Sequence, residues 1–291
     1  MNCKLCPHKC GALRTKDTMA GKCGLTTEIK VARIAPHMWE EPPISGTRGS
    51  GTVFFSGCTL NCIFCQNYKI SAENFGTSIT AEKLADEFKR LEEYGVHNIN
   101  LVSATQFIPE IIKTFEIYKP SVPVVYNTGG FERVETLKAL EGIVDIYLPD
   151  FKYSDNKLGL EYSGAENYVE TALSAICEMF RQKGKLSLDD EGIAQKGVLV
   201  RHLVLPNHTR NSLDALNILK ENFGDFLTLS LMGQYTPCGK ACDHIKLSRK
   251  ITKREYQKVL DRLIDLETEG YSQELTAATE EYIPDWDYKN K

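Results

Sequence analysis

Cys58-Thr59-Leu60-Asn61-Cys62-Ile63-Phe64-Cys65 places three cysteines within eight residues, separated by three residues and then by two. The apolar run Thr52-Val53-Phe54-Phe55 precedes it and predicts a buried β-strand. Ser56-Gly57 then provides a turn. The thiols are therefore expected on a loop at the carboxyl end of a strand, where α/β proteins hold their reactive groups.

The number of thiols on this loop favours an iron–sulfur cluster. A [4Fe-4S] cluster is normally held by four cysteine thiolates. Cys58, Cys62 and Cys65 would bind three of its irons and leave the fourth open to a ligand, as reactive metal sites keep a position open. Phe64 is placed to lie against a flat ring such as adenine. The alternative is a zinc knuckle completed by a distant residue, which the preceding strand and Phe64 disfavour.

Strand and helix patterns alternate from Thr52 onward. Strands are predicted at residues 52–55, 98–102, 122–126, 143–148, 197–205 and 226–231, and helices at 81–91, 109–118, 134–140, 167–182, 212–223 and from about 252 to 267. The last helix opens on a capping box, Thr252 to Glu255. Serial strand–helix units predict a parallel sheet with right-handed crossovers. Six units suit an α/β fold with an open, partial (β/α)6 barrel of TIM type.

Polar residues follow the predicted strands and are expected around one mouth of the barrel, because parallel strands end on the same side. They are Ser103, Thr105, Asn127, Asp150, Lys152, Arg201 and Gln234. Their mixed chemistry suits a ligand that carries both charges. Cys238 and Cys242 follow the sixth strand and could bind a metal, donate a hydrogen atom or be incidental. Cys177, within an apolar helical pattern, is interpreted as a core residue.

The Cys-x3-Cys-x-aromatic-Cys spacing resembles the signature of the radical S-adenosylmethionine (SAM) superfamily. The flanking residues 49–58 and Cys65-Gln66-Asn67 resemble the branch of pyruvate formate-lyase activating enzymes. The resemblance implies a [4Fe-4S] cluster and SAM as cofactors, a flavodoxin or ferredoxin as electron donor, and a (β/α)6 partial barrel. It implies an oxidoreductase that cleaves SAM reductively to methionine and a 5′-deoxyadenosyl radical, which then abstracts a hydrogen atom from a substrate.

The resemblance also implies SAM-binding roles for Phe64 and for the seven polar residues that follow the strands. Relatives carry Gly-Gly-Glu after the second strand, where it holds the amino group of SAM; this chain has Ser103-Ala104-Thr105-Gln106, so neutral acceptors replace a carboxylate. Asp150-Phe151-Lys152 resembles the Asp-x-Lys that follows the fourth strand of activating enzymes, and Arg201 matches a basic residue on their fifth strand.

A second cysteine unit lies upstream, with Cys3, Cys6, Cys10 and Cys23 in the order Cys-x2-Cys-x3-Cys-x12-Cys. Four thiolates form a closed site, which suits structural zinc or an auxiliary iron–sulfur cluster equally well. His8 could replace one cysteine. The alternative is four thiols without a metal, although so short a segment cannot hold a core of its own.

Length and composition predict one large α/β domain with a small appendage: the chain has 291 residues, a net charge of −4 and 42 % hydrophobic residues. We divide it into a Cys-rich metal-binding segment (1–30), a connecting arm (31–51), the partial barrel (52–270) and a C-terminal tail (271–291). The mild acidity argues against nucleic acid or an anionic membrane as partner. Clustered thiols, with no signal-peptide or membrane-spanning pattern, predict a cytoplasmic protein.

Three functional hypotheses follow from the sequence. The first is a glycyl-radical-activating enzyme, whose substrate is a backbone glycine of a partner enzyme. The second is a radical SAM enzyme that modifies a peptide, a small molecule or a protein side chain. The third is a metal-binding structural or redox module without catalysis. The absence of Gly-Gly-Glu, and a cysteine unit placed before the barrel rather than after the cluster loop, weaken the first.

Overall fold

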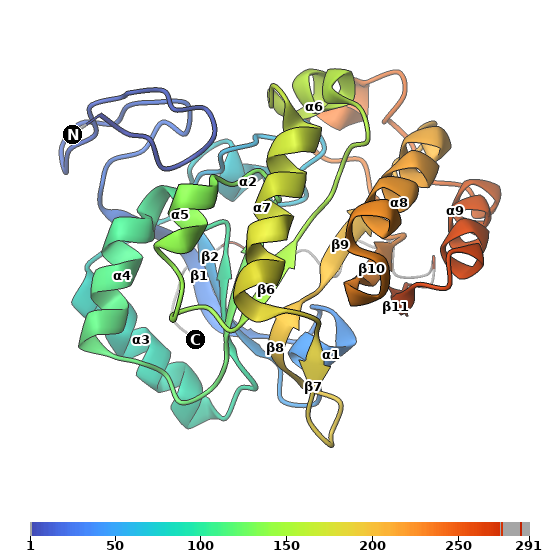
Figure 1. Cartoon of the computed structure of the whole chain (residues 1–291). Coiled ribbons are helices and arrows are strands. Elements are labelled where there is room, and N and C mark those ends of the chain that lie inside the picture. Colours follow the sequence, from blue (N-terminus) through green and yellow to red (C-terminus); the bar gives the residue numbers. More distant parts are fainter. Residues whose placement is uncertain (1, 274, 276–285, 287–291) are drawn as a thin grey trace.

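The computed structural model describes residues 2–273, 275 and 286, and shows an α/β fold whose parallel strands carry helices on their outer face (Figure 1). Its strands are β1 (Ile29–His37), β2 (Ser50–Phe55), β3 (Thr77–Ile79), β4 (Ile99–Val102), β5 (Val124–Thr128), β6 (Ile146–Pro149), β7 (Ser187–Leu188), β8 (Ala194–Val198), β9 (Val200–Leu203), β10 (Thr228–Met232) and β11 (Glu269–Ser272). Its helices are α1 (Pro42–Ser45), α2 (Tyr68–Ser71), α3 (Ala81–Tyr94), α4 (Ile108–Ile117), α5 (Val134–Lys138), α6 (Asn156–Ser163), α7 (Tyr168–Lys183), α8 (Thr209–Phe223) and α9 (Lys253–Asp265).

The strands form two sheets that meet at one point. The larger sheet has the order β3-β1-β2-β4-β5-β6-β8-β7 and the smaller has the order β11-β10-β9. The single strand predicted at 197–205 is in fact two strands: β8 pairs with β6, and β9 pairs with β10. A parallel bridge between Asp150 and Arg201 joins the sheets beside this break. The curved, open arrangement therefore continues from β2 to β10 as a partial barrel.

The sheet is mixed rather than purely parallel. β2, β4, β5, β6 and β8 run parallel, but β1 lies antiparallel to both β2 and β3. β1 is nine residues long and lies between β3 and β2. Because β1 covers the free edge of β2, the strand that leads into the cysteine loop is paired on both sides and wholly buried.

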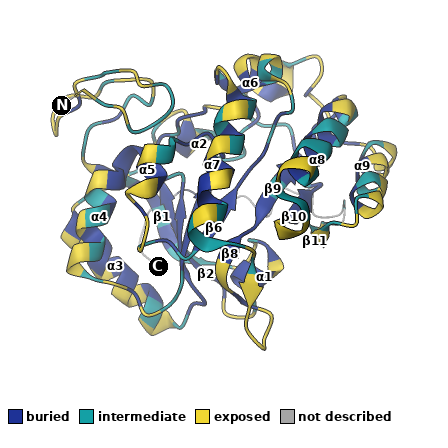
Figure 2. Cartoon of the chain, in the orientation of Figure 1, coloured by how far each residue is buried: buried dark blue, intermediate teal, exposed yellow. Residues whose placement is uncertain are grey.

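Helix ends follow their local sequence signals. Thr80 caps α3 by accepting from the Lys83 N–H, and Gly95 ends the helix in the left-handed region with φ of 90°. The capping box predicted for α9 is confirmed, with the side chains of Thr252 and Glu255 each bonded to the other's backbone N–H. The helices bury the faces that contact the sheets and expose the opposite faces (Figure 2). Cys177 lies on an exposed face of α7, so its assignment to the core was wrong.

The connecting arm closes one end of the barrel. α1 lies at the end opposite the cysteine loop and α2 (Figure 1). The wholly buried Ile44 packs there in a cluster that contains Val125, Ile146, Leu148, Ala194 and Leu199. The Asn98 side chain donates to the Ile44 carbonyl at 2.7 Å, which satisfies an orphan acceptor of this short helix. The arm is thus part of the barrel core, and it fixes the residues that precede α1.

Replacing Ile44 with alanine should lower the free energy of unfolding by about 2–5 kcal/mol, because a buried cluster cannot fully collapse around the lost methylenes. Urea unfolding of the apoprotein measures this. Ile245→Ala is the control: Ile245 is 90 % exposed, so its replacement should change the free energy by less than about 0.5 kcal/mol. Equal effects of the two substitutions would contradict the assignment of Ile44 to the barrel core.

Candidate functional site

The backbone conformation of the cysteine loop, between β2 and α2, is closely constrained. Gly57 has φ of 77°, and a Cβ there would lie 2.3 Å from Leu25 Cδ1, so glycine is required on both grounds. Asn61 also adopts a left-handed conformation, with φ of 52°. The Cys65 N–H donates to the Cys62 carbonyl at 3.1 Å. These constraints turn all three thiol residues toward one cavity of about 220 Å³.

Each sulfur of this loop accepts a hydrogen bond. Ser163 Oγ donates to Cys62 Sγ at 2.9 Å, Ser71 Oγ to Cys65 Sγ at 3.4 Å, and the Leu60 N–H to Cys58 Sγ at 3.4 Å. Burial raises the pKa of the Cys62 thiol to about 12, although the nearby charge of Lys152 opposes the shift. A buried thiol of this kind gives up its proton when its sulfur binds a metal ion. Donors aimed at sulfur are the contacts that tune a thiolate-bound cluster.

The cavity gathers most of the predicted cofactor residues at the carboxyl ends of the strands. Seven of the eight line it together with the three thiols: Phe64, Ser103, Asn127, Asp150, Lys152, Arg201 and Gln234. Phe64 is 5 % exposed, and its ring centroid lies 6.1 Å from that of Tyr235. Ser103 has φ of 57°, a conformation that favours glycine. These seven predicted residues therefore line one cavity.

Thr105 is the predicted residue that does not line this cavity. Its hydroxyl donates to Glu132 Oε1 at 2.6 Å and contacts the Tyr126 hydroxyl at 3.1 Å. Its neighbour Gln106 is also engaged, since Nε2 donates to the carbonyls of Ser56, Gly57 and Ser103. The segment that replaces Gly-Gly-Glu thus braces the turn before the cysteine loop and supplies only Ser103 to the cavity.

A buried charge network forms the wall of the cavity. Arg201 Nε donates to Asp150 Oδ1 at 2.7 Å, and Lys152 Nζ contacts the other oxygen of Asp150. Burial alone would raise the pKa of Asp150, but the charges of Arg201 and Lys152 hold that pKa below its ordinary value. Arg201 also donates to Asn127 Oδ1 at 2.7 Å. Four of the predicted residues are therefore one connected group.

Sequence reasoning missed the acidic residues that the arm contributes. Glu40 lines the cavity, and its carboxylate lies 3.5 Å from Arg201 Nη1, with the amides of Asn100 and Asn127 at 3.2–3.4 Å. Glu41 is 5 % exposed, and its Oε2 lies 3.7 Å from the same nitrogen. Burial raises the pKa of Glu40 in spite of Arg201. In the sequence, the only feature that marks these two residues is that the adjacent glutamates directly precede Pro42 and Pro43.

The four upstream cysteines also lie together. Cys3, Cys6, Cys10 and Cys23 line a second, much smaller cavity of about 10 Å³. Among the described residues, no three His, Cys, Asp or Glu side chains already converge as ligands of one ion, here or at the loop of residues 58–65. His8 is not in this thiol group: its Nε2 lies 2.7 Å from the Thr59 carbonyl.

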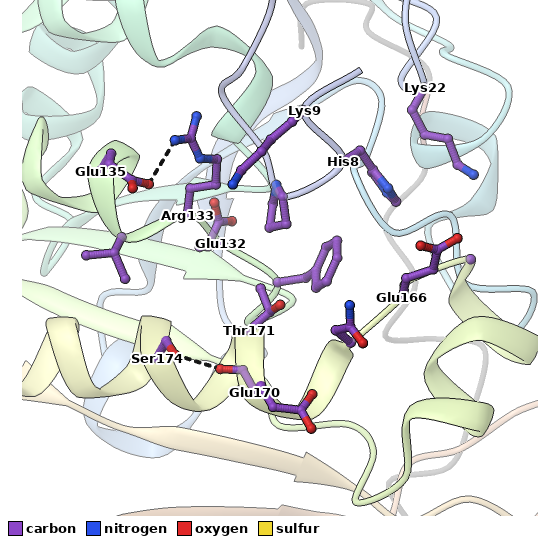
Figure 3. A pocket seen from close by; sticks show the side chains of 15 residues that line it. His8, Lys9, Lys22, Glu132, Arg133, Glu135, Glu166, Glu170, Thr171 and Ser174 are labelled. Carbon is purple, nitrogen blue, oxygen red and sulfur yellow. Dashed lines mark hydrogen bonds and ion pairs between the residues drawn. The ribbon is translucent and has the colours of Figure 1, made fainter. Parts of the chain in front are cut away.

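Two other predicted features lie outside the thiol-lined cavity. Cys238 and Cys242 are not among its lining residues, and they flank or belong to the 3-10 helix Gly239–Asp243. A groove of about 570 Å³ lies beneath the upstream cysteine unit, with His8, Lys9 and Lys22 on one side and Glu166 and Glu170 on the other (Figure 3). It is the larger cavity, but it contains no thiol, so the chemistry is assigned to the cavity at the loop.

A family model for the radical SAM superfamily matches residues 52–216, which is more than half of the chain. The chain belongs to the radical SAM superfamily. Membership implies a [4Fe-4S] cluster and SAM, and the soft sulfur donors of the loop, each with a hydrogen-bond donor, fit such a cluster. The model match begins at β2 and includes all three cysteines of the loop.

The chain is similar to an uncharacterized protein, MJ0674, of Methanocaldococcus jannaschii, with 30 % identity over 276 residues that cover 89 % of this chain and 73 % of the relative. Among solved structures it resembles methylornithine synthase (PylB), with a TM-score of 0.52 and 17 % identity, and HydG, a maturase of the [FeFe]-hydrogenase, with 0.51 and 18 %. These alignments cover 76 % and 80 % of this chain, but 63 % and 54 % of the others. At such identities they show the radical SAM fold alone.

In the described part of the chain, no helix combines the length and the apolar character that crossing a membrane would require.

Ser163→Ala should make the reduction potential of the loop cluster more negative by about 30 mV, because a lost hydrogen bond to sulfur worth about 0.7 kcal/mol favours the oxidised state. Redox titration of the reconstituted cluster, followed by electron paramagnetic resonance, measures the shift. Ser174→Ala is the control, since Ser174 is exposed and donates only to the Glu170 carbonyl. A potential unchanged by Ser163→Ala would contradict the Ser163–Cys62 contact.

Proposed function

We propose that this protein is a radical SAM enzyme that cleaves SAM reductively and removes a hydrogen atom from a substrate bound at the barrel mouth. The observation that carries the proposal is the single cavity shared by Cys58, Cys62, Cys65 and the polar residues at the strand ends. A cofactor with an ammonium, a carboxylate, a ribose diol and an adenine needs such mixed chemistry. The match to the superfamily model, which includes the cysteine loop and the strands from β4 to β9, supports the proposal.

The three thiolates would hold the cluster and leave one iron open. When bound, the cluster and SAM supply the electron transfer that breaks a carbon–sulfur bond to give methionine and a 5′-deoxyadenosyl radical. The chain's own part is to bind, orient and exclude water. The hydroxyls of Ser71 and Ser163 orient two of the sulfurs, and the buried Phe64 offers an apolar face for the adenine.

The charged residues would bind the two ends of the amino acid part of SAM. Lys152 and Arg201 line the cavity as cations, and either can bind a carboxylate. Thr105 and Gln106 are bonded elsewhere, so we assign the ammonium or a ribose hydroxyl of SAM to Ser103 and Glu40, which line the cavity. Glu40, from the connecting arm, would thus take the role of the glutamate in the Gly-Gly-Glu of relatives, which this chain lacks after its second parallel strand.

We retain two classes of target, both with a flavodoxin or ferredoxin as electron donor. One is a backbone glycine of a glycyl radical enzyme, as in the activating-enzyme branch, which the flanking residues 49–58 favour. The other is a peptide, a small molecule or another protein side chain, favoured by the altered segment Ser103-Ala104-Thr105-Gln106. Electron paramagnetic resonance with a candidate glycyl radical enzyme separates the two, because the first alone gives a stable glycyl radical.

Anaerobic reconstitution with iron, sulfide, SAM and a strong reductant tests the radical-forming step. We expect 5′-deoxyadenosine, quantified by mass spectrometry, from the wild type and from Cys177→Ala, whose thiol is exposed on α7. Cys62→Ala should abolish it, because three thiolates are needed to hold the cluster. Wild-type protein that forms no more product than Cys62→Ala would overturn the proposal and leave a non-catalytic metal module.

Glu40→Gln should weaken SAM binding about tenfold or more, because the loss of a buried charged acceptor costs about 1.5–3 kcal/mol. Equilibrium binding of SAM to the reconstituted protein measures the dissociation constant. Glu28→Gln is the matched control at an exposed glutamate. Unchanged affinity in Glu40→Gln, with the cluster intact by absorbance, would show that Glu40 does not contact SAM.

A further inference from the structure

The upstream cysteine segment has almost no apolar packing of its own. Its backbone is organised by two isolated antiparallel bridges, Asn2 with Leu13 and Ala20 with Leu25. Among the described residues before Leu25, no hydrophobic side chain belongs to the buried core. Leu13 and Met19 are 60 % and 68 % exposed. A segment of this size needs a cross-link or a metal to keep one conformation.

The backbone nevertheless places the four cysteines of this segment around one small cavity. Cys3, Cys6, Cys10 and Cys23 surround the cavity of about 10 Å³. Gly21, with φ of 84°, lies so close that a Cβ there would be 3.0 Å from Cys10 Sγ. Turns closed by the Lys9 N–H to the Cys6 carbonyl and the Gly24 N–H to the Gly21 carbonyl hold the thiol-bearing loops. The chain is shaped around the sulfurs rather than around an apolar core.

A buried cation beside the thiols points to a missing negative charge. Arg14 is 8 % exposed, and its guanidinium donates to the carbonyls of Leu25, Thr26 and Gln106 and lies 3.9 Å from Cys3 Sγ. Within the part of the chain that the structure describes, no carboxylate pairs with it. A buried charge without a partner is costly. Thiolates bound to a metal would supply the counter-charge.

We propose that Cys3, Cys6, Cys10 and Cys23 bind one zinc ion. Four thiolates around Zn²⁺ carry a net charge of −2, which Arg14 partly neutralises. The four thiols line one small cavity in a segment that has no apolar core of its own, and structural zinc held by four thiolates supplies folding energy to segments of this kind. The thiols already line the cavity and turn into it when the ion binds, since metal sites of this class form together with their fold.

The zinc unit also positions the loop that holds the other three thiols. His8 Nε2 contacts the Thr59 carbonyl at 2.7 Å, and Arg14 Nη1 donates to the Gln106 carbonyl at 3.0 Å. Asn74, beyond α2, donates to the carbonyls of Cys23 and Gly24, each at 3.3 Å. These contacts tie the unit to both sides of the cysteine loop. Losing the zinc should therefore loosen Thr59 and its neighbours without removing any ligand of the loop cluster.

Zinc analysis of the full chain tests this proposal independently of the proposed function. Protein purified from zinc-supplemented cultures should contain one zinc per chain by inductively coupled plasma mass spectrometry. Cys10→Ser and Cys23→Ser should lose nearly all of it, whereas Cys177→Ser should keep it. The triple variant Cys58→Ala, Cys62→Ala, Cys65→Ala should also keep its zinc while it loses the loop cluster. Zinc that disappears from this triple variant, or iron in place of zinc at the four upstream cysteines, would overturn the proposal.

Two further measurements guard against misfolded variants. X-ray absorption at the zinc edge of the wild type should show four sulfur ligands at about 2.3 Å; nitrogen ligands or fewer sulfurs would contradict the assigned set. Hydrogen exchange of Cys10→Ser should accelerate about tenfold or more at residues 2–25 and 57–62, and stay unchanged in α8. Acceleration throughout the chain, α8 included, would mean general unfolding and would leave the absorption result on the wild type to decide.

Discussion

The side on which parallel strands end determines where the chemistry of this protein lies. β2, β4, β5 and β6 run in the same direction, so the residues that follow them reach one mouth even though they are far apart in the sequence. The cysteine loop follows β2, a buried strand that is paired on both sides, so the position of the loop at that mouth is closely fixed. Thiols, cations and amides that are far apart along the chain can therefore line the same cavity.

Burial at this mouth makes each polar group depend on its neighbours. Arg201 is inside the protein and is held by Asp150, Asn127 and the arm carboxylates. Opposite charges keep Asp150 ionised, while burial raises the pKa of Glu40 and, to about 7, that of Glu41. The two arm carboxylates therefore keep a proton up to a higher pH than exposed carboxylates do, and a cationic ligand would favour their charged forms.

Local patterns were sufficient to predict the units of the barrel and the loop that holds the thiols. The strand before Cys58, the caps of α3 and α9, and the cavity positions of seven of the eight predicted cofactor residues follow from periodicity and from strand-end placement. The features that local patterns did not predict depend on tertiary packing. Ile44 enters the barrel only because α1 folds back, and Glu40 comes with it. Thr105 fell outside the site because Glu132, from another loop, accepts its hydroxyl.

The proposed chemistry requires that one iron of the loop cluster be open to SAM within the shared cavity. Mössbauer spectroscopy of the wild-type protein, reconstituted anaerobically in the absence and presence of SAM, tests this most directly. We expect SAM to change the signal of one iron site of the cubane and to leave the three thiolate-bound sites unchanged. A spectrum that SAM does not alter, or a cluster whose four irons all respond equally, would contradict it.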